Sequence, residues 1–498
     1  MSSSYIPAPR FVSLHHLCRC TVPVLYVVLL FGAVTGQVHA LTKPSDERRV
    51  SASRLGDSDS LDKEALTPGP ADAEIPGIFV GLVTGESGDV QEDLQALRSR
   101  WHPGMVPMAL ESLRFSRHGG VSAGLVELLE DKTGQRFGRD LDSWYVWLWK
   151  REEQAHPHYA DFKSMLYRNL DPLFAGYFSN ERKSTIRLDE VRWGGVRQDG
   201  IPPLRSPLMI DASDADYLDD DNVVFGIEIN GDARAYPKRI LAWHEMFTDT
   251  IGGIDYAGVY CTLCGAVILY ETVHKGVHHE LGTSGFLYRS NKVMYDKATQ
   301  SLWNTTWGQP VSGPLVGKGI QLERSYVVTT TWGEWRRRHP DTTVLSLDTG
   351  HRRDYREGAA YEDYFATDRL MFTVAHRDDR LRNKAEILAL QFPDKTDKRL
   401  AISADFLSEN PVYHHELGGQ GLVVLTDGSG ANRVYDPGNV TLVEYDGQES
   451  VTDDQGRVWR LSEDALQLAG QPPLVRLPAH RAFWFGWVAV WNDTELVM

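Results

Sequence analysis

The spacing of apolar residues changes at about Trp193, and this change constrains the fold more than any other feature of the chain. Before it, apolar residues recur three or four positions apart, which is the period of a helix with one buried face. After it, they alternate or form short runs between turn signals, as strands do. The sequence therefore predicts an α+β protein, with an N-terminal helical segment over residues 78–192 and a large β-rich domain over residues 193–498.

Three apolar stripes define the predicted helical segment, and an acidic residue at Asp140 is placed to cap the second of them. Because one buried face accounts for such stripes, we interpret them as core and not as a cofactor site. The stripes are Leu125, Leu128 and Leu129; Leu141, Trp144, Trp147 and Leu148; and Tyr159, Phe162, Leu166 and Leu170.

A hairpin signature opens the β-rich region. Asn230-Gly231 separates two apolar runs, residues 223–229 and 233–236, and this dipeptide favours the positive-φ turn that matches the twist of paired strands. Further strands are predicted at residues 254–260, 266–270, 292–295, 343–347, 421–425, 440–445 and 481–491, with short helices at 239–247 and 332–339.

The first forty residues have the pattern of an export signal. A basic stretch that includes Arg10 and Arg19 precedes an apolar run over residues 22–34, and small residues end at Ala40. We predict a signal peptide over residues 1–40, with an uncleaved N-terminal anchor as the alternative. Residues 41–77 are rich in Ser, Asp, Pro and Ala and predict a flexible linker. The expected location is exported, periplasmic or extracellular.

The net charge limits the class of partner. The chain carries a formal charge of −16, and an acidic surface repels phosphate backbones. We therefore expect no nucleic-acid partner, but an unidentified small molecule or protein. Apart from the N-terminal run, no stretch is long and apolar enough to span a bilayer.

Two cysteines remain once the predicted signal, which contains Cys18 and Cys20, is removed. Cys261 and Cys264 stand in the spacing of a metal knuckle, in which two thiolates bind one ion from a tight turn. Two more ligands are needed, and the candidates are His244 and Met294. Thiolate, imidazole and thioether suit copper or zinc. Two alternatives stay open: a structural or redox-active disulfide, and a pair of inert buried thiols.

A series of short sequence motifs from Gly200 onward resembles those of a known family. The sequence is similar to domain-of-unknown-function family 3179, a bacterial and often exported group, over roughly residues 195–497. The resemblance implies no activity. The motifs are Gly200–Pro203, Gly226–Pro237, Ile240–Glu245, Tyr260–Gly265, Gly282–Gly285, Leu287–Asn291, Trp332–Trp335, His339–Thr342 and Phe483–Trp487.

Polar residues near the cysteines in sequence are the candidates for catalysis. Glu245 adjoins His244 and could orient an imidazole or act as a base. Ser284, Arg289 and Asn291 could fix an anionic or amide-bearing ligand, although a glycine turn before a strand explains the same stretch. The leading hypothesis is an exported enzyme or metal-binding protein that uses the Cys-x-x-Cys site. The alternative is a non-catalytic binding or assembly module with an aromatic-lined surface.

Overall fold

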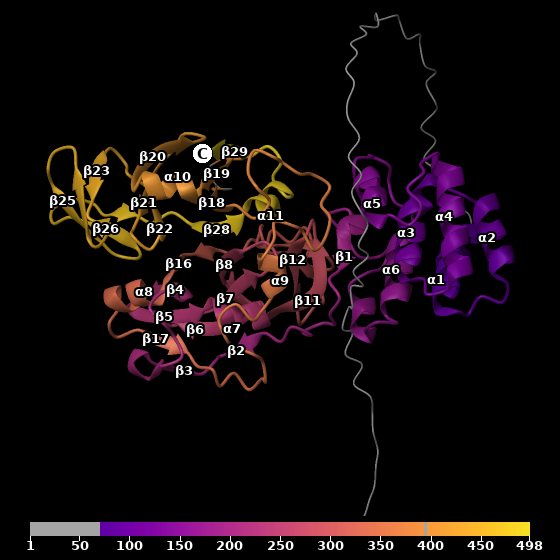
Figure 1. The fold of residues 1–498 in the computed structure, drawn as a ribbon, viewed down its shortest axis with the longest axis horizontal. Coiled ribbons are helices and arrows are strands. Elements are labelled where there is room, and N and C mark those ends of the chain that lie inside the picture. The colour runs from indigo at the N-terminus through magenta and orange to yellow at the C-terminus, as the bar shows by residue number, and fades with distance from the viewer. Residues whose placement is uncertain (1–69, 393–395) are drawn as a thin grey trace, which may run out of the picture. The chain divides into compact units, whose positions relative to one another are not determined.

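The computed structural model describes residues 70–392 and 396–498 (Figure 1). The predicted signal peptide and residues 41–69 of the predicted linker lie outside these residues. The predicted linker, residues 41–77, overlaps the first ordered elements: a 3₁₀ turn covers Pro70–Glu74, and helix α1 begins at Ile75. Ile75 and Phe79 of this helix are fully buried, so ordered structure begins before residue 77.

The predicted helical segment is confirmed. Asp140 accepts hydrogen bonds from the backbone N–H of Asp142 and Ser143 and so caps α5, as expected. Leu125, Leu128 and Leu129 are buried. The helices are α1 (Ile75–Thr84), α2 (Val90–Ser99), α3 (Val106–Phe115), α4 (Gly119–Thr133), α5 (Leu141–Trp149) and α6 (Tyr159–Tyr167), with 3₁₀ turns at Pro103–Met105, Pro172–Gly176 and Leu188–Glu190.

Three five-stranded sheets form the first part of the β-rich region, and with the helices they confirm the α+β class. In sheet order, the first is β1 (Val191–Trp193), β11 (Leu281–Tyr288), β12 (Asn291–Asp296), β13 (Leu302–Asn304) and β14 (Gln309–Ser312). The second is β15 (Arg324–Ser325), β8 (Ala266–Glu271), β7 (Ile254–Cys261), β6 (Met246–Ile251) and β2 (Leu204–Arg205). The third is β16 (Val328–Thr331), β4 (Val223–Ile229), β5 (Asp232–Pro237), β17 (Thr343–Leu345) and β3 (Met209–Asp211).

The C-terminal part adds sheets of four, three and five strands, and a two-stranded sheet completes the β-rich region. One is β28 (Ala479–Phe483), β18 (Glu386–Gln391), β19 (Arg399–Ser403) and β29 (Glu495–Val497), and another is β20 (Val412–Leu417), β21 (Gln420–Thr426) and β22 (Asn432–Tyr435). A third is β23 (Leu442–Tyr445), β24 (Ser450–Asp453), β25 (Val458–Leu461), β26 (Ala465–Gln467) and β27 (Leu474–Val475); β9 (Val273–His274) pairs with β10 (Val277–His278). The helices of the whole β-rich region are α7 (Lys238–His244), α8 (Trp332–Arg338), α9 (Glu362–Phe365), α10 (Ala404–Glu409) and α11 (Trp484–Val488), with a 3₁₀ turn at Ala212–Asp214.

The predicted hairpin at Asn230-Gly231 is confirmed. β4 and β5 pair in register from Ile229 with Asp232, and both turn residues have positive φ, 51° and 83°. The strand predicted over residues 481–491 is wrong beyond Phe483, where α11 begins. Trp484 and Trp487 are buried in that helix, and a run that is apolar throughout does not distinguish a buried strand from a buried helix.

One hydrophobic core joins the helical segment to the first sheet. It contains residues of α1 to α6 together with Val191 of β1, Phe286 of β11 and Val293 of β12. In addition, Lys163 of α6 donates a hydrogen bond to the Val191 carbonyl at 2.9 Å. Among residues 70–392 and 396–498, no helix has the length and apolar character needed to cross a bilayer.

Candidate functional site

Cys261 and Cys264 form a disulfide in the turn between β7 and β8. Both are buried, with 3% and 1% of their surface exposed. The turn is held from two sides, because Phe483 N–H donates to the Cys264 carbonyl at 2.8 Å and the Tyr364 hydroxyl donates to the Leu263 carbonyl at 2.7 Å. The disulfide alternative is therefore the one that the structure contains.

The predicted metal site is not assembled, because its four ligands do not meet. Both sulfurs are in the disulfide, and the nitrogens of His244 lie 2.8 Å from the Pro202 carbonyl and 2.5 Å from the Tyr355 hydroxyl. Met294 is fully buried in a core cluster that contains neither cysteine. Within the described part of the chain, no three His, Cys, Asp or Glu side chains come together as metal ligands would.

A cavity of ≈ 60 Å³ lies beside the cysteine turn, and we call it the Lys292 cavity. Its walls bring together segments far apart in the sequence, including Ile201, Glu245, Leu263, Ser284 and Lys292. At about 10–15 Å³ for each water-sized group, it has room for about five non-hydrogen atoms. A ligand of that size is a small metabolite and not a polymer.

A buried ion pair stands in the wall of this cavity. Lys292 Nζ lies 2.7 Å from Glu245 Oε2, and the Tyr361 hydroxyl donates to Glu245 Oε1 at 3.3 Å. Burial lowers the pKa of Lys292, and the Glu245 carboxylate opposes that shift in part. Burial, followed by the charge of Glu245, raises the pKa of Tyr361. The pair therefore combines an amine that loses its proton more readily than usual with an adjacent proton acceptor.

The backbone at two of these residues is unusual. Glu245 ends α7 with φ 55°, and Tyr361 precedes α9 with φ 59°. Non-glycine residues rarely adopt this left-handed conformation, and where they do, the surrounding structure has to hold them there. With this backbone conformation, the side chains of Glu245 and Tyr361 meet in a hydrogen bond. Such strain is concentrated at functional sites more often than elsewhere in proteins.

The family comparison covers most of the β-rich region. Residues 198–494 match the family described as "Protein of unknown function (DUF3179)", which is more than half of the chain. The chain belongs to this family. No curated protein and no solved structure matches it. The Lys292 cavity lies within the DUF3179 segment, whereas α1 to α6 precede it.

The other predicted catalytic residues have mainly structural contacts. Ser284 lines the Lys292 cavity, but its hydroxyl donates to the Val293 carbonyl at 2.6 Å. The Asn291 side chain donates to the Gly486 carbonyl at 2.8 Å and so ties β12 to α11. Arg289 pairs with Glu190 and lines a neighbouring cavity, away from Glu245. Only Glu245 has the place expected of a reacting group.

Sequence reasoning missed two residues of the Lys292 cavity, Lys292 and Tyr361. Lys292 is the second residue of β12, a strand that is buried at every position, and a lysine next to such an apolar run could have been taken as a signal, because lysine is almost never buried unless paired. Tyr361 gave no signal. It lies in a loop that reaches Glu245 from more than a hundred positions away.

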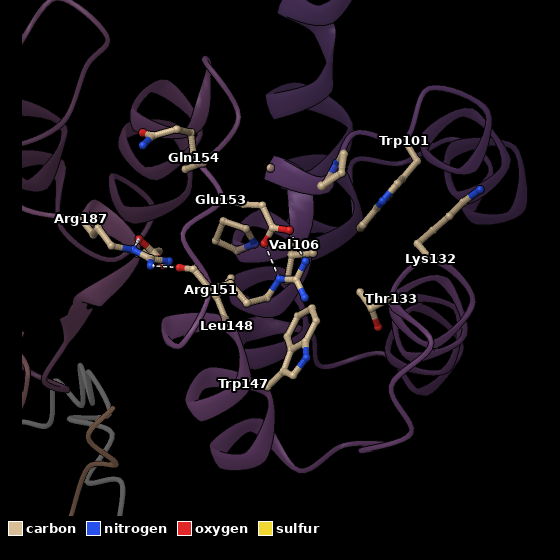
Figure 2. A pocket seen from close by; sticks show the side chains of 15 residues that line it. Trp101, Val106, Lys132, Thr133, Trp147, Leu148, Arg151, Glu153, Gln154 and Arg187 are labelled. Atoms are coloured by element: carbon tan, nitrogen blue, oxygen red, sulfur yellow. Dashed lines mark hydrogen bonds and ion pairs between the residues drawn. The ribbon is translucent and has the colours of Figure 1, made fainter. Parts of the chain in front are cut away.

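A different cavity, of ≈ 140 Å³, lies in the helical segment outside the DUF3179 match. Figure 2 shows Arg151 and Glu153 turned toward each other in it, with the Trp147 ring beside the guanidinium, and Trp101 on another wall. Arg187 is paired in the same way with Asp189, at 2.7 Å. These charged side chains in the wall of the cavity are therefore paired with each other, Arg151 with Glu153 and Arg187 with Asp189.

Proposed function

We propose that the protein is an enzyme that acts on a small carbonyl compound, with Lys292 as the nucleophile and Glu245 as the group that accepts and returns its proton. The observation that carries the proposal is the buried Lys292–Glu245 pair in the wall of a cavity of ≈ 60 Å³. A lysine whose pKa is lowered by burial is a typical amine nucleophile.

The step balances within the pair. Lys292 ammonium gives one proton to Glu245, and the neutral amine adds to the carbonyl carbon. One N–H proton of the added amine moves to the former carbonyl oxygen, which gives a carbinolamine. Its hydroxyl takes the second proton back from Glu245 and leaves as water, so that a protonated imine remains beside a Glu245 carboxylate. One positive and one negative charge are therefore paired before and after the step, which avoids an unpaired buried charge.

Glyoxylate with sodium borohydride tests this, because glyoxylate has five non-hydrogen atoms and borohydride fixes an imine as a stable amine. Peptide mapping by mass spectrometry is expected to find the adduct on Lys292, formed faster than on the exposed surface lysine Lys297. Glu245→Gln should slow it. Lys163, which is fully buried and also paired with a glutamate, is the matched control and should stay unmodified. Absence of an adduct on Lys292 would overturn the proposal.

A second candidate function is ligand binding by the helical segment, favoured by Trp101 and Trp147 in the wall of its cavity (Figure 2). Aromatic faces bordered by polar groups bind sugars and peptides. Screening of the protein against a glycan array, with Trp101→Ala as the comparison, tests it. Binding that does not depend on Trp101 would count against this cavity.

Export is part of the proposal. A disulfide supports it, since disulfides persist in oxidising compartments and are rare in the cytosol. N-terminal sequencing of the protein from its native host is expected to give Leu41 as the first residue. An intact N-terminus in the membrane fraction would favour the anchor instead.

A further inference from the structure

A second cavity of the β-rich region, of ≈ 150 Å³, lies on another side of the cysteine turn. It is bounded by β16, by Gly265 of that turn, by the ends of β18 and β28, and by Ser429 and Gly430 between β21 and β22. β28 packs against β8 at this place, and β16 contacts β22. We call it the Tyr260 cavity.

Tyr260 contributes a buried hydroxyl without a partner. The residue lines the cavity and is only 1% exposed, and its hydroxyl makes no hydrogen bond to any residue that the structure describes. Burial of an unsatisfied hydroxyl is costly, so that such groups usually have a ligand or ordered water to bind. A phenol next to a cavity can donate to an acceptor placed there.

Arg481 contributes a second unused donor. Its guanidinium donates to the Asn432 side chain at 2.9 Å and pairs with Glu386, but its buried Nε has no acceptor within the described part of the chain. Arg481 and Glu386 both line the cavity. The arginine is therefore held in place by its other nitrogens, while one N–H stays available.

Lys238 makes the charge of the cavity positive. Its ammonium lies 5.2 Å from the centre of the Phe365 ring and forms no hydrogen bond or ion pair with a described residue. Among the residues that line the cavity, Lys238 and Arg481 are basic and Glu386 alone is acidic, while Glu245 and Glu357 act on Tyr260 from outside the lining. One positive charge is thus left over, and an anionic ligand would neutralise it.

Hydroxyl groups form the remaining polar wall. Thr329, Thr330 and Thr331 of β16 line the cavity, and Thr330 Oγ1 lies 3.0 Å from Ser429 Oγ. Hydroxyls both donate and accept, so they suit a ligand that carries hydroxyls of its own. At about 10–15 Å³ for each water-sized group, the volume accommodates about ten to fifteen non-hydrogen atoms.

We infer that the Tyr260 cavity binds a small hydroxycarboxylate, of the sugar-acid class, with its carboxylate toward Lys238, Tyr260 and Arg481 and its hydroxyls toward β16. The Tyr260 cavity and the Lys292 cavity share no lining residue, although the Tyr260 backbone N–H donates to the Glu245 carbonyl at 2.9 Å. Neither proposal needs the other. The inference rests on the unpaired donors of Tyr260 and Arg481, on the excess positive charge of the cavity lining and on the volume of the cavity.

Calorimetric titration of the full chain with gluconate tests the inference, with sorbitol and acetate as matched probes. Gluconate has the carboxylate and the hydroxyls, sorbitol has the hydroxyls alone, and acetate has the carboxylate alone. We expect gluconate to bind at least tenfold more tightly than either. Tyr260→Phe, which removes one oxygen, should weaken gluconate by about tenfold or more, since hydrogen bonds to charged groups are among the strong ones. Lys238→Met should weaken it as well.

The controls decide between outcomes. Lys292→Met should leave gluconate binding unchanged, and glyoxylate trapping at Lys292 should survive Tyr260→Phe. Equal binding of sorbitol would overturn the anionic part of the inference, and equal binding of acetate or inorganic phosphate would overturn the hydroxyl part. Absence of gluconate binding, or an unchanged dissociation constant in Tyr260→Phe, would overturn the assignment as a whole.

Discussion

Within residues 70–392 and 396–498, the helical segment and the β-rich region each contain one buried lysine–glutamate pair, and the two pairs differ in their surroundings. In the helical segment, Lys163 Nζ lies 2.6 Å from Glu111 Oε1, with side-chain exposures of 0% and 2%. In the β-rich region, the Lys292–Glu245 distance is 2.7 Å, with exposures of 5% and 12%. Burial lowers the pKa of both lysines. By chemistry alone the pairs are equivalent.

The two pairs differ in whether a cavity adjoins them and in the backbone conformation of the glutamate. Lys163 also donates to the Val191 carbonyl and lies over the rings of Tyr159, Tyr167 and Phe178, and it lines none of the cavities described above. Both Glu111 and Lys163 lie within regular helices, whereas Glu245 has a left-handed backbone beside a cavity. A buried ion pair is therefore weak support for a site unless a cavity and an unusual backbone accompany it.

The largest expected effect separates these two pairs. Lys163→Met should lower the free energy of unfolding by about 3–5 kcal/mol, because Glu111 would be left as an unpaired buried charge. Lys292→Met should lower it by only about 1–3 kcal/mol, because water in the adjacent cavity can solvate Glu245. Urea unfolding at neutral pH measures both. Adding Glu111→Leu to Lys163→Met should restore most of the loss. Equal losses for the two lysine variants would remove the distinction.

Acid should destabilise both regions through buried histidines. Burial, followed by neighbouring His102 and His158, lowers the pKa of His156 to about 4, and burial lowers that of His244 to about 4. Since an unfolded histidine titrates near 6.5, the unfolded chain binds more protons between pH 4 and 6.5. Stability is complete above that window and falls as the pH drops through it, by up to about 1.4 kcal/mol per pH unit for each residue.

Unfolding curves from pH 7 to pH 4 measure this slope, and His156→Gln and His244→Gln should each flatten it. The two variants also compare the regions. If only one of them flattens the slope, the other histidine does not contribute to the loss of stability in acid.

The fold was largely predictable because its signals are local. Helical stripes, the Asp140 cap and the Asn-Gly turn each depend on residues a few positions apart. Prediction failed where the local pattern was ambiguous. The helix expected over residues 239–247 ends at His244, because Glu245 turns left-handed and Met246 starts β6. At Trp484 an entirely apolar run gave no period to measure.

The site was predictable only in part, because it depends on long-range contacts. Cys261 and Glu245 were found from their types and spacing, yet the disulfide and the ion pair each needed the fold to choose a partner. No local pattern connects Glu245 to Lys292, or to Tyr361. Nothing in the sequence around Tyr260 indicates that its hydroxyl has no partner among the described residues, because that depends on the folded structure.

Loss of the disulfide should have an intermediate effect, confined to the β-rich region. Closing a four-residue loop contributes about 2 kcal/mol in the chain-entropy model, so the double variant Cys261→Ala/Cys264→Ala should lose about that much stability. Because Leu263 of the same turn lines the Lys292 cavity, glyoxylate trapping at Lys292 should also slow. Unchanged stability together with unchanged trapping would show that the turn is held by Tyr364 and Phe483 alone.

The smallest expected effect compares one helix cap from each region. Asp140 accepts hydrogen bonds from two backbone N–H groups at 3.1 and 3.2 Å and from the Ser143 hydroxyl at 2.6 Å. Thr331 accepts one bond, from Glu334 N–H at 3.4 Å, at the start of α8. Asp140→Ala should therefore cost about 1 kcal/mol, and Thr331→Ala about 0.5 kcal/mol. Urea unfolding of both variants measures the difference. A larger loss for Thr331→Ala would mean that its hydroxyl, in the wall of the Tyr260 cavity, does more than cap a helix.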